Sequence, residues 1–191
     1  MRLCFIVQRY GREVNGGAEF HCREVAEHLV KYASVDVVTT CAVDYITWKN
    51  EYSPGIDTLD GVTIRRFPVD QERDLSKFNR FSEVVFCHPH SYKDEIEWMK
   101  LQGPYSSSLL EYLSENKDNY DVFIFFTYLY CTTFFGLSLV GDRAMLVPTA
   151  HDEPPIYLSI FENLFHLPQA ILYNTEEERN FVTSKFHNGT I

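Results

Sequence analysis

The first place where this sequence could do chemistry is a glycine-rich segment near its amino terminus. Gly16 and Gly17 stand just before a helical pattern. Glycine lets the backbone approach a ligand closely, and the first N–H groups of a helix are free to bind an anion. Arg9 and Arg12 add positive charge to the same loop. The spacing predicts a phosphate or pyrophosphate cradle, with an ordinary tight turn as the alternative; it matches neither Gly-x-Gly-x-x-Gly nor a P-loop.

The second place is His151-Asp152-Glu153, which directly follows a buried apolar run. An imidazole there could donate a hydrogen bond to a sugar hydroxyl or exchange a proton near neutral pH. A turn histidine bonded to nearby backbone is the alternative. Asp152 or Glu153 could act as a base, but carboxylates in front of Pro154-Pro155 also suit the start of a helix.

Further polar residues follow other predicted strands. Tyr128 carries a hydroxyl just after one strand, and Asn174 follows the last strand. Thr175 and Glu178 have the spacing of a capping box, which gives Glu178 a structural reading beside a ligand-binding one. The cluster Cys87-His88-Pro89-His90 contains metal-ligand types, but its spacing is wrong for zinc pairs and no second cluster completes four ligands. No metal site is predicted.

Composition excludes several classes of protein. The chain has 191 residues, enough for one domain with a real core. Its 17 Lys and Arg against 27 Asp and Glu give a net charge of −10, which argues against a nucleic-acid partner. No apolar run reaches the roughly 18 residues of a membrane span. Five scattered cysteines and the lack of a secretion signal favour reduced thiols in the cytoplasm.

The elements that must position these residues alternate between strand and helix. Short apolar runs predict strands at 2–8, 35–41, 61–69, 121–126, 144–150 and 170–173, and helical spacing follows Ala18 and Thr175. This order predicts an α/β fold with a doubly wound, mostly parallel, Rossmann-like sheet and helices on both faces. Ligands of such sheets bind beyond the carboxyl ends of the strands, where Gly16, Tyr128, His151 and Asn174 would meet.

The remaining segments carry weaker signals. Residues 44–60 predict a loop, and Pro68 predicts that the strand over 61–69 ends toward an edge of the sheet. Residues 70–118 predict a helical insertion within a single domain, with Pro104 in the first turn of its last helix. A helical segment is expected over 127–139. Another helix is expected to start at Pro154-Pro155, with one apolar face formed by Ile156, Ile160, Phe161 and Leu164.

An ordered set of motifs carries a resemblance. It consists of RLCFIVQ, GGAE (16–19), VDVVTTC, GPYSSSLLEYL (103–113), YDVFIFFTYLY (120–130), VPTAHDEPP (147–155) and LYNTEEER (172–179). In this order they resemble the amino-terminal, acceptor-side half of a GT-B glycosyltransferase of the retaining family 4 type. That family has two Rossmann-like domains facing each other across a cleft. The second domain mainly holds the nucleotide sugar and carries a Glu-x7-Glu pair.

The resemblance implies roles for five of the candidate residues. His151 would be the catalytic histidine that contacts the donor sugar, Gly16 and Gly17 would lie near the donor diphosphate and the acceptor, and Asn174 and Glu178 would line the cleft. Position after a strand and side-chain chemistry add four further expected substrate-binding residues: Arg9, Arg12, Tyr128 and Asp152. A nucleotide sugar would be the co-substrate, a glycan or lipid-linked sugar the acceptor, and no metal or other cofactor is expected. The sequence stops about where the second domain would begin, so that domain is expected to be missing and the chain alone to be inactive.

The implied chemistry is sugar transfer with retention of configuration, in which backbone N–H groups stabilise the departing diphosphate. No nucleophile stands out, which favours attack on the same face as the leaving group. Two alternatives stay open. One is a nucleotide-sugar epimerase that uses Asp152 and Glu153; the other is a module that binds a glycan, a lipid-linked sugar or a protein without turnover. Peripheral contact with the inner membrane face is also left open.

Overall fold

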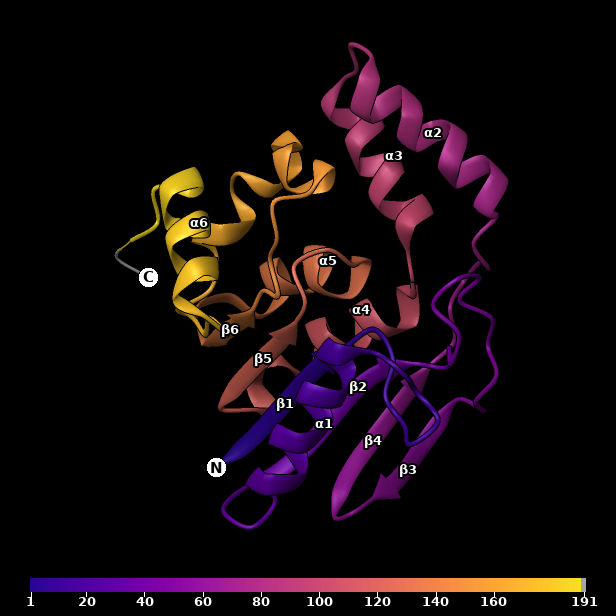
Figure 1. Cartoon of the computed structure of the whole chain (residues 1–191). Helices are drawn as coiled ribbons and strands as arrows, with labels where there is room; N and C mark the ends of the chain where they lie inside the picture. Colours follow the sequence, from indigo (N-terminus) through magenta and orange to yellow (C-terminus); the bar gives the residue numbers. More distant parts are fainter. Residues whose placement is uncertain (190–191) are drawn as a thin grey trace.

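A computed structural model describes residues 1–189 and contains a seven-stranded sheet (Figure 1). The strand order is β3-β4-β2-β1-β5-β6-β7, and every neighbouring pair except β3 and β4 is parallel. The predicted α/β class with a mostly parallel, doubly wound sheet is confirmed. The strands are β1 (Arg2–Val7), β2 (Ser34–Thr40), β3 (Gly55–Leu59), β4 (Val62–Phe67), β5 (Val122–Phe126), β6 (Ala144–Val147) and β7 (Ala170–Ile171).

The central strand β1 is buried on both faces because helices cover each side of the sheet. Phe5 packs with α1 (Gly17–Leu29), whose buried residues include Cys22 and Ala26. Cys4 and Ile6 point to the opposite face, where α4 (Ser107–Asn116) and α5 (Cys131–Val140) lie. Figure 1 shows α1 in front of the strands, with α4 and α5 behind them. A strand buried in this way reads as a continuous apolar run, as RLCFIV does.

One strand lies where the sequence predicted a loop. Within residues 44–60, β3 pairs antiparallel with β4 and forms the edge of the sheet. All five residues of β3 are exposed or half-exposed, so no buried apolar run marks it. The prediction that the strand before Pro68 tends toward an edge is also wrong, because β4 lies between β2 and β3.

Three helices occupy the segment between β4 and β5. They are α2 (Leu75–Cys87), α3 (Tyr92–Gln102) and α4, and the first two form a pair that Figure 1 shows projecting away from the sheet. Each begins at a polar cap: Asp74, Ser91 and Ser106 accept hydrogen bonds from backbone N–H groups of the first turn. Pro104 is not in the first turn of the last helix, because the cap at Ser106 starts α4 at Ser107.

Two further helical predictions needed correction. The helix expected over 127–139 begins only at Cys131, after a connection that follows β5. It is apolar on nearly all sides because it packs against the sheet, α4 and α3, and so it lacks the one-sided pattern of a surface helix. The segment after Pro154 is not one helix but three short 3₁₀ turns, η3 (Pro154–Tyr157), η4 (Ser159–Phe161) and η5 (Leu164–His166). Its four predicted apolar residues are nevertheless buried. The last element of the described chain is α6 (Glu176–Phe186).

Candidate functional site

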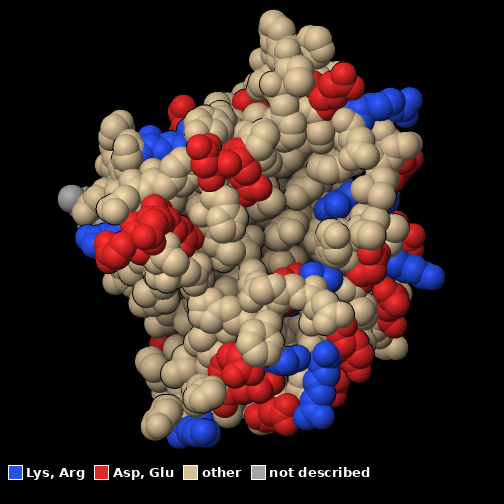
Figure 2. Space-filling model, viewed as in Figure 1, with Lys and Arg blue, Asp and Glu red and all other residues tan. Residues whose placement is uncertain are grey.

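Loops that follow four parallel strands meet at the carboxyl edge of the sheet and enclose two adjoining cavities. The first cavity, of about 490 Å³, lies between the start of α1, the loop after β6 and the start of α6. The second cavity, of about 350 Å³, lies between the end of β1, the start of α1 and the segment after β5. Gly17, Ala18, Thr149 and His151 line both. Figure 2 shows a hollow near the centre of this face, walled mostly by uncharged residues.

The two glycines at the start of α1 have different surroundings. Gly16 is the N-cap residue, and no side chain caps the helix there. A Cβ on Gly16 would lie 2.1 Å from Oε2 of Glu19 and 3.0 Å from Nη2 of Arg9, so this position has no room for a side chain. A Cβ on Gly17 would meet nothing within 4 Å. Gly16 therefore permits close packing, whereas Gly17 keeps the helix start open to both cavities.

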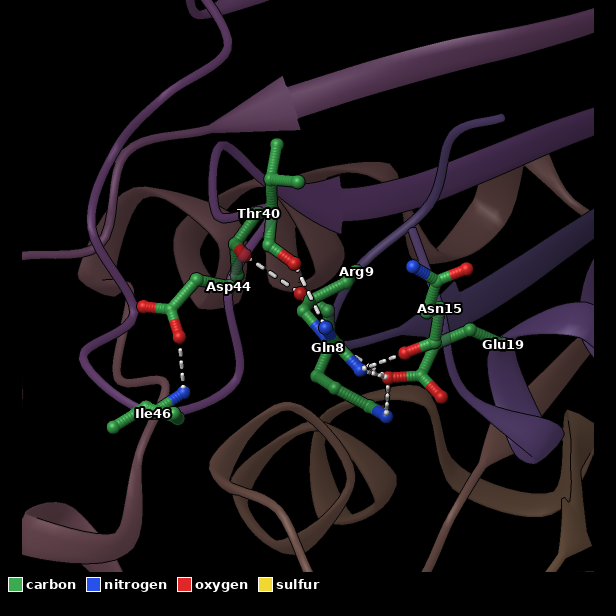
Figure 3. Close-up of polar contacts among 8 residues, drawn as sticks. Gln8, Arg9, Asn15, Glu19, Thr40, Asp44 and Ile46 are labelled. Atoms are coloured by element: carbon green, nitrogen blue, oxygen red, sulfur yellow. Dashed lines mark hydrogen bonds and ion pairs between the residues drawn. The ribbon is translucent and has the colours of Figure 1, made fainter. Parts of the chain in front are cut away.

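Arg9 is buried and does not offer a free positive charge. Its Nε and Nη2 donate to Oε1 of Glu19 at 2.9 and 2.5 Å. Its Nη1 donates to the carbonyl of Val43 at 2.7 Å, and Nη2 also donates to the carbonyl of Asn15 at 3.1 Å. Figure 3 shows these contacts together with Gln8, whose Nε2 donates to the same Glu19 oxygen. Arg9 does line the second cavity, but its charge is neutralised by Glu19 rather than held ready for phosphate.

Arg12 is not part of this site. It is exposed and makes two 2.9 Å hydrogen bonds to the carboxylate of Asp60, beyond the walls of both cavities. The predicted joint action of Arg9 and Arg12 on one anion is therefore wrong. Membership of the same loop in the sequence did not separate a buried arginine from a solvated one.

His151 lies where the sequence placed it, exposed at the junction of the two cavities. In the loop that carries it, Thr149 has a φ of 51°. A β-branched residue rarely adopts this left-handed conformation, so the turn after β6 is strained. The hydroxyl of Thr149 is buried without a hydrogen-bond partner among residues 1–189. This turn is a feature of the site that no sequence pattern indicated.

The two carboxylates after His151 are each engaged by a tyrosine. Asp152 accepts a 2.7 Å hydrogen bond from the hydroxyl of Tyr157, and Glu153 accepts one of 2.7 Å from the hydroxyl of Tyr128. Tyr128 is almost fully buried and lines the second cavity, and burial together with Glu153 raises its pKa. The sequence placed Tyr128 at the site correctly but did not foresee that its hydroxyl donates a hydrogen bond to Glu153.

Glu178 ties two loops of the site together. Its Oε1 accepts the N–H of Ala150 at 2.6 Å, and its Oε2 accepts the N–H of Asn174 at 2.7 Å. Only half of the predicted capping box forms, because the hydroxyl of Thr175 accepts the N–H of Glu178 while the Glu178 carboxylate reaches the other loops. Asn174 and Glu178 both line the first cavity. Glu178 acts there by holding backbone in place.

Several residues that line the cavities were not among the predicted site residues, although Tyr130, like Tyr128, follows a strand end and carries a hydroxyl. His21 comes one turn after Gly17 on α1 and faces the first cavity. Gln8, Glu19 and Tyr130 line the second cavity, and burial raises the pKa of Tyr130. Gln8 ends the apolar run of β1, so a polar residue at that point could have been noticed as the start of the site.

Other predicted features lie elsewhere. In residues 1–189, no group of three or more His, Cys, Asp and Glu side chains is placed to hold a metal ion. His90 from the cysteine–histidine cluster instead pairs with Glu95 at 2.9 Å. All five cysteines are free, and only Cys87 is exposed. No helix of the described chain is both long and apolar enough to cross a membrane.

When the chain is compared with known proteins, no family model matches it, and no curated protein sequence matches it either.

Proposed function

We propose that this chain is the acceptor-side domain of a retaining glycosyltransferase of the GT-B type. In this proposal the chain binds a sugar acceptor and contributes to donor binding, while a second domain supplies most of the nucleotide-sugar site. The observation that carries the proposal is the pair of adjoining cavities at the carboxyl edge of the sheet, with His151 and the open start of α1 between them.

The geometry supports a division of tasks at this edge. Gly17 and Ala18 begin α1 without a side-chain cap, and their N–H groups can stabilise negative charge on a departing phosphate. His151 is exposed beside them and can donate a hydrogen bond to a sugar hydroxyl. Asp152 and Glu153 each accept a hydrogen bond from a tyrosine, so neither carboxylate after His151 is free to act as the nucleophile, which favours same-face attack.

The test begins with the encoding gene beyond the codon for Ile191. We expect a second βα domain with a Glu-x7-Glu pair, in the same reading frame or in a partner gene. The complete protein should release nucleoside diphosphate from one member of a panel of UDP-, GDP- and ADP-sugars when an acceptor extract is added. His151→Ala and Gly17→Val should each lower that rate by at least about a hundredfold. The first removes the hydrogen bond to the sugar, and the second places a side chain in the open space where a phosphate would approach the helix start.

The matched control is Arg12→Gln, which lies outside both cavities and should keep the full rate. Full transfer by the His151→Ala and Gly17→Val proteins would contradict the proposed site. Epimer formation without an acceptor would indicate the epimerase instead. Sugar binding without release of nucleotide from any donor, by the complete protein, would indicate a binding module.

A further inference from the structure

We infer that the second cavity takes a group that donates hydrogen bonds, such as the hydroxyls of an uncharged sugar or an amino sugar, and that it rejects phosphate. The inference rests on the proposed function only where it identifies this ligand as the acceptor. The charge preference follows from the cavity wall itself, through Arg9, Gln8, Glu19 and Glu153.

The single guanidinium in the wall is not available to a ligand. Arg9 is 5% exposed, and its Nε, Nη1 and Nη2 all donate to protein oxygens. The ring of Tyr45 lies 5.5 Å from its guanidinium carbon and helps to cover it. A phosphate entering the cavity would have to break the ion pair with Glu19 before it could use this charge, and breaking a buried pair is costly.

Gln8 lines the cavity and carries a buried acceptor without a partner in the described chain. Its side chain is 1% exposed, and Oε1 has no hydrogen-bond partner among residues 1–189. The orientation of the amide is fixed, because the other end of the amide donates to a Glu19 carboxylate oxygen that can only accept. The Gln8 main-chain carbonyl is also held, by the hydroxyl of Thr40 at 2.6 Å. A buried acceptor without a partner favours a ligand that brings a donor.

The carboxylates of the wall add to the same preference. All hydrogen bonds to Glu19 end on Oε1, which leaves Oε2 beside Gly16 in the first turn of α1. A negative charge is favourable at a helix start, and Glu19 supplies one on the side of the second cavity. An anion that enters this cavity therefore meets a like charge, whereas the first cavity, which Gly17 and Ala18 also line, lacks Glu19 in its wall. Arg9 and Glu19 neutralise each other, and Glu153 remains as the charge that a ligand meets.

The preference of the second cavity for a hydrogen-bond donor over a phosphate can be tested with three ligands on the ¹⁵N-labelled chain at neutral pH. They are D-glucose, D-glucosamine and D-glucose 6-phosphate. Chemical-shift changes of the Gln8 side-chain amide report on the second cavity. Glucose and glucosamine should both shift this signal. Glucose 6-phosphate has the same ring but a phosphate of nearly two negative charges, and its dissociation constant at this signal should be at least about tenfold higher.

Substitutions in the cavity wall should change the relative affinities for these three ligands. Gln8→Met keeps the length of the side chain and should weaken glucose binding by about tenfold. Because this variant lacks the Gln8 amide, its binding is followed at the backbone amide of Leu129, which lines only the second of the two cavities. Glu19→Gln should free Arg9 and make glucose 6-phosphate the tighter ligand. If Glu19→Gln does not fold, Glu153→Gln removes a wall carboxylate without touching the buried pair and should raise the relative affinity for glucose 6-phosphate. Arg12→Gln is the control and should leave all three dissociation constants unchanged.

Two results would overturn the inference. One is a wild-type chain that binds glucose 6-phosphate at Gln8 as tightly as glucose; the other is a Gln8 signal that none of the three probes shifts. Neither result decides whether the complete protein transfers sugar. Conversely, a complete protein without transferase activity whose second cavity still prefers uncharged and amino sugars would contradict the proposed function alone.

Discussion

At Gly16 and Gly17, two identical neighbours face opposite constraints. Gly16 has extended backbone that any residue can adopt, so what excludes a side chain there is the contact with Glu19 and Arg9. Gly17 has open space beside it. The sequence predicted that both glycines serve the ligand. The structure assigns that role to Gly17 and gives Gly16 a packing role.

This difference predicts unequal effects of alanine. Gly16→Ala should destabilise the chain by about 1–3 kcal/mol, because the new methyl group overlaps the buried ion pair. Gly17→Ala should change the free energy of unfolding by no more than about 0.5 kcal/mol. Urea unfolding of both variants measures this. If both variants lost the same free energy of unfolding, the Arg9–Glu19 ion pair would have to move aside at little cost.

A second pair of neighbours tests the role of Glu178. Glu178→Gln replaces one of two buried acceptors by an NH₂ group that faces a backbone N–H, either of Ala150 or of Asn174. We expect a loss of about 1–3 kcal/mol in the free energy of unfolding. Glu177→Gln, on the exposed side of the same helical turn, should stay within about 0.5 kcal/mol. If the two variants were equally stable, Glu178 would not be what joins the loops.

At the scale of elements, a buried carboxylate attaches the projecting α2–α3 pair to the segment after β6. Oε2 of Glu95 on α3 accepts the hydroxyl of Ser159 and the N–H of Ile160, both at 2.8 Å. Its Oε1 pairs with His90, which lies between the two helices. This contact joins the part of the molecule that departs furthest from the sheet to the loop that carries His151.

The contact should depend on pH. The carbonyl of His88, and then Glu95, raise the pKa of His90 above its ordinary 6.5. The contribution of His90 to the free energy of unfolding is therefore complete below pH 6.5 and is lost as pH rises through the raised pKa. Burial alone would raise the pKa of Glu95, but hydrogen bonds from Ser159, Ile160 and His90 leave it below its ordinary 4.5. The contribution of Glu95 to the free energy of unfolding is complete above pH 4.5 and is lost as pH falls through the lowered pKa.

The two contributions are complete together between about pH 4.5 and 6.5. His90→Ala should therefore cost the most stability in this window, by about 0.2–1 kcal/mol because the histidine is partly solvated, and progressively less above it. Urea unfolding across a pH series checks this. His166→Ala, an exposed histidine without an ion pair among residues 1–189, should show no such maximum. A cost for His90→Ala that does not change with pH would exclude the pairing.

The elements also show what sequence patterns can predict. β1 and β5 were found because burial on both faces makes them continuous apolar runs. β3 was missed because an exposed edge strand needs no such run, and the three turns after Pro154 were read as one helix because their apolar spacing is the same. Because His151 and Tyr128 directly follow strands, the sequence predicted that both lie at the site, and both line the cavities. The partners of Arg9, Arg12 and Glu178 lie far along the chain or in other loops, and no local spacing could reveal them.

At the scale of the whole molecule, the sheet divides the chain into parts of unequal stability. β1 is paired on both sides, with β2 and β5, and helices cover both of its faces. β3 is paired only with β4 and is exposed, and the main contacts of α2 are with α3. Regions with few buried contacts open locally, at a lower free energy than global unfolding.

Hydrogen exchange measured by mass spectrometry should therefore show a graded order. Amides of β1 and β5 should exchange only through global unfolding, since no smaller opening exposes them. Amides of α2 and β3 should exchange at least about a hundredfold faster, which corresponds to opening at about 3 kcal/mol less. Peptides from α1 serve as an internal reference, because this helix packs directly on the central strands. If α2 were as protected as β1, the α2–α3 pair would have to be covered by something besides α3 and η4, and the contact through Glu95 would no longer explain how this pair is held.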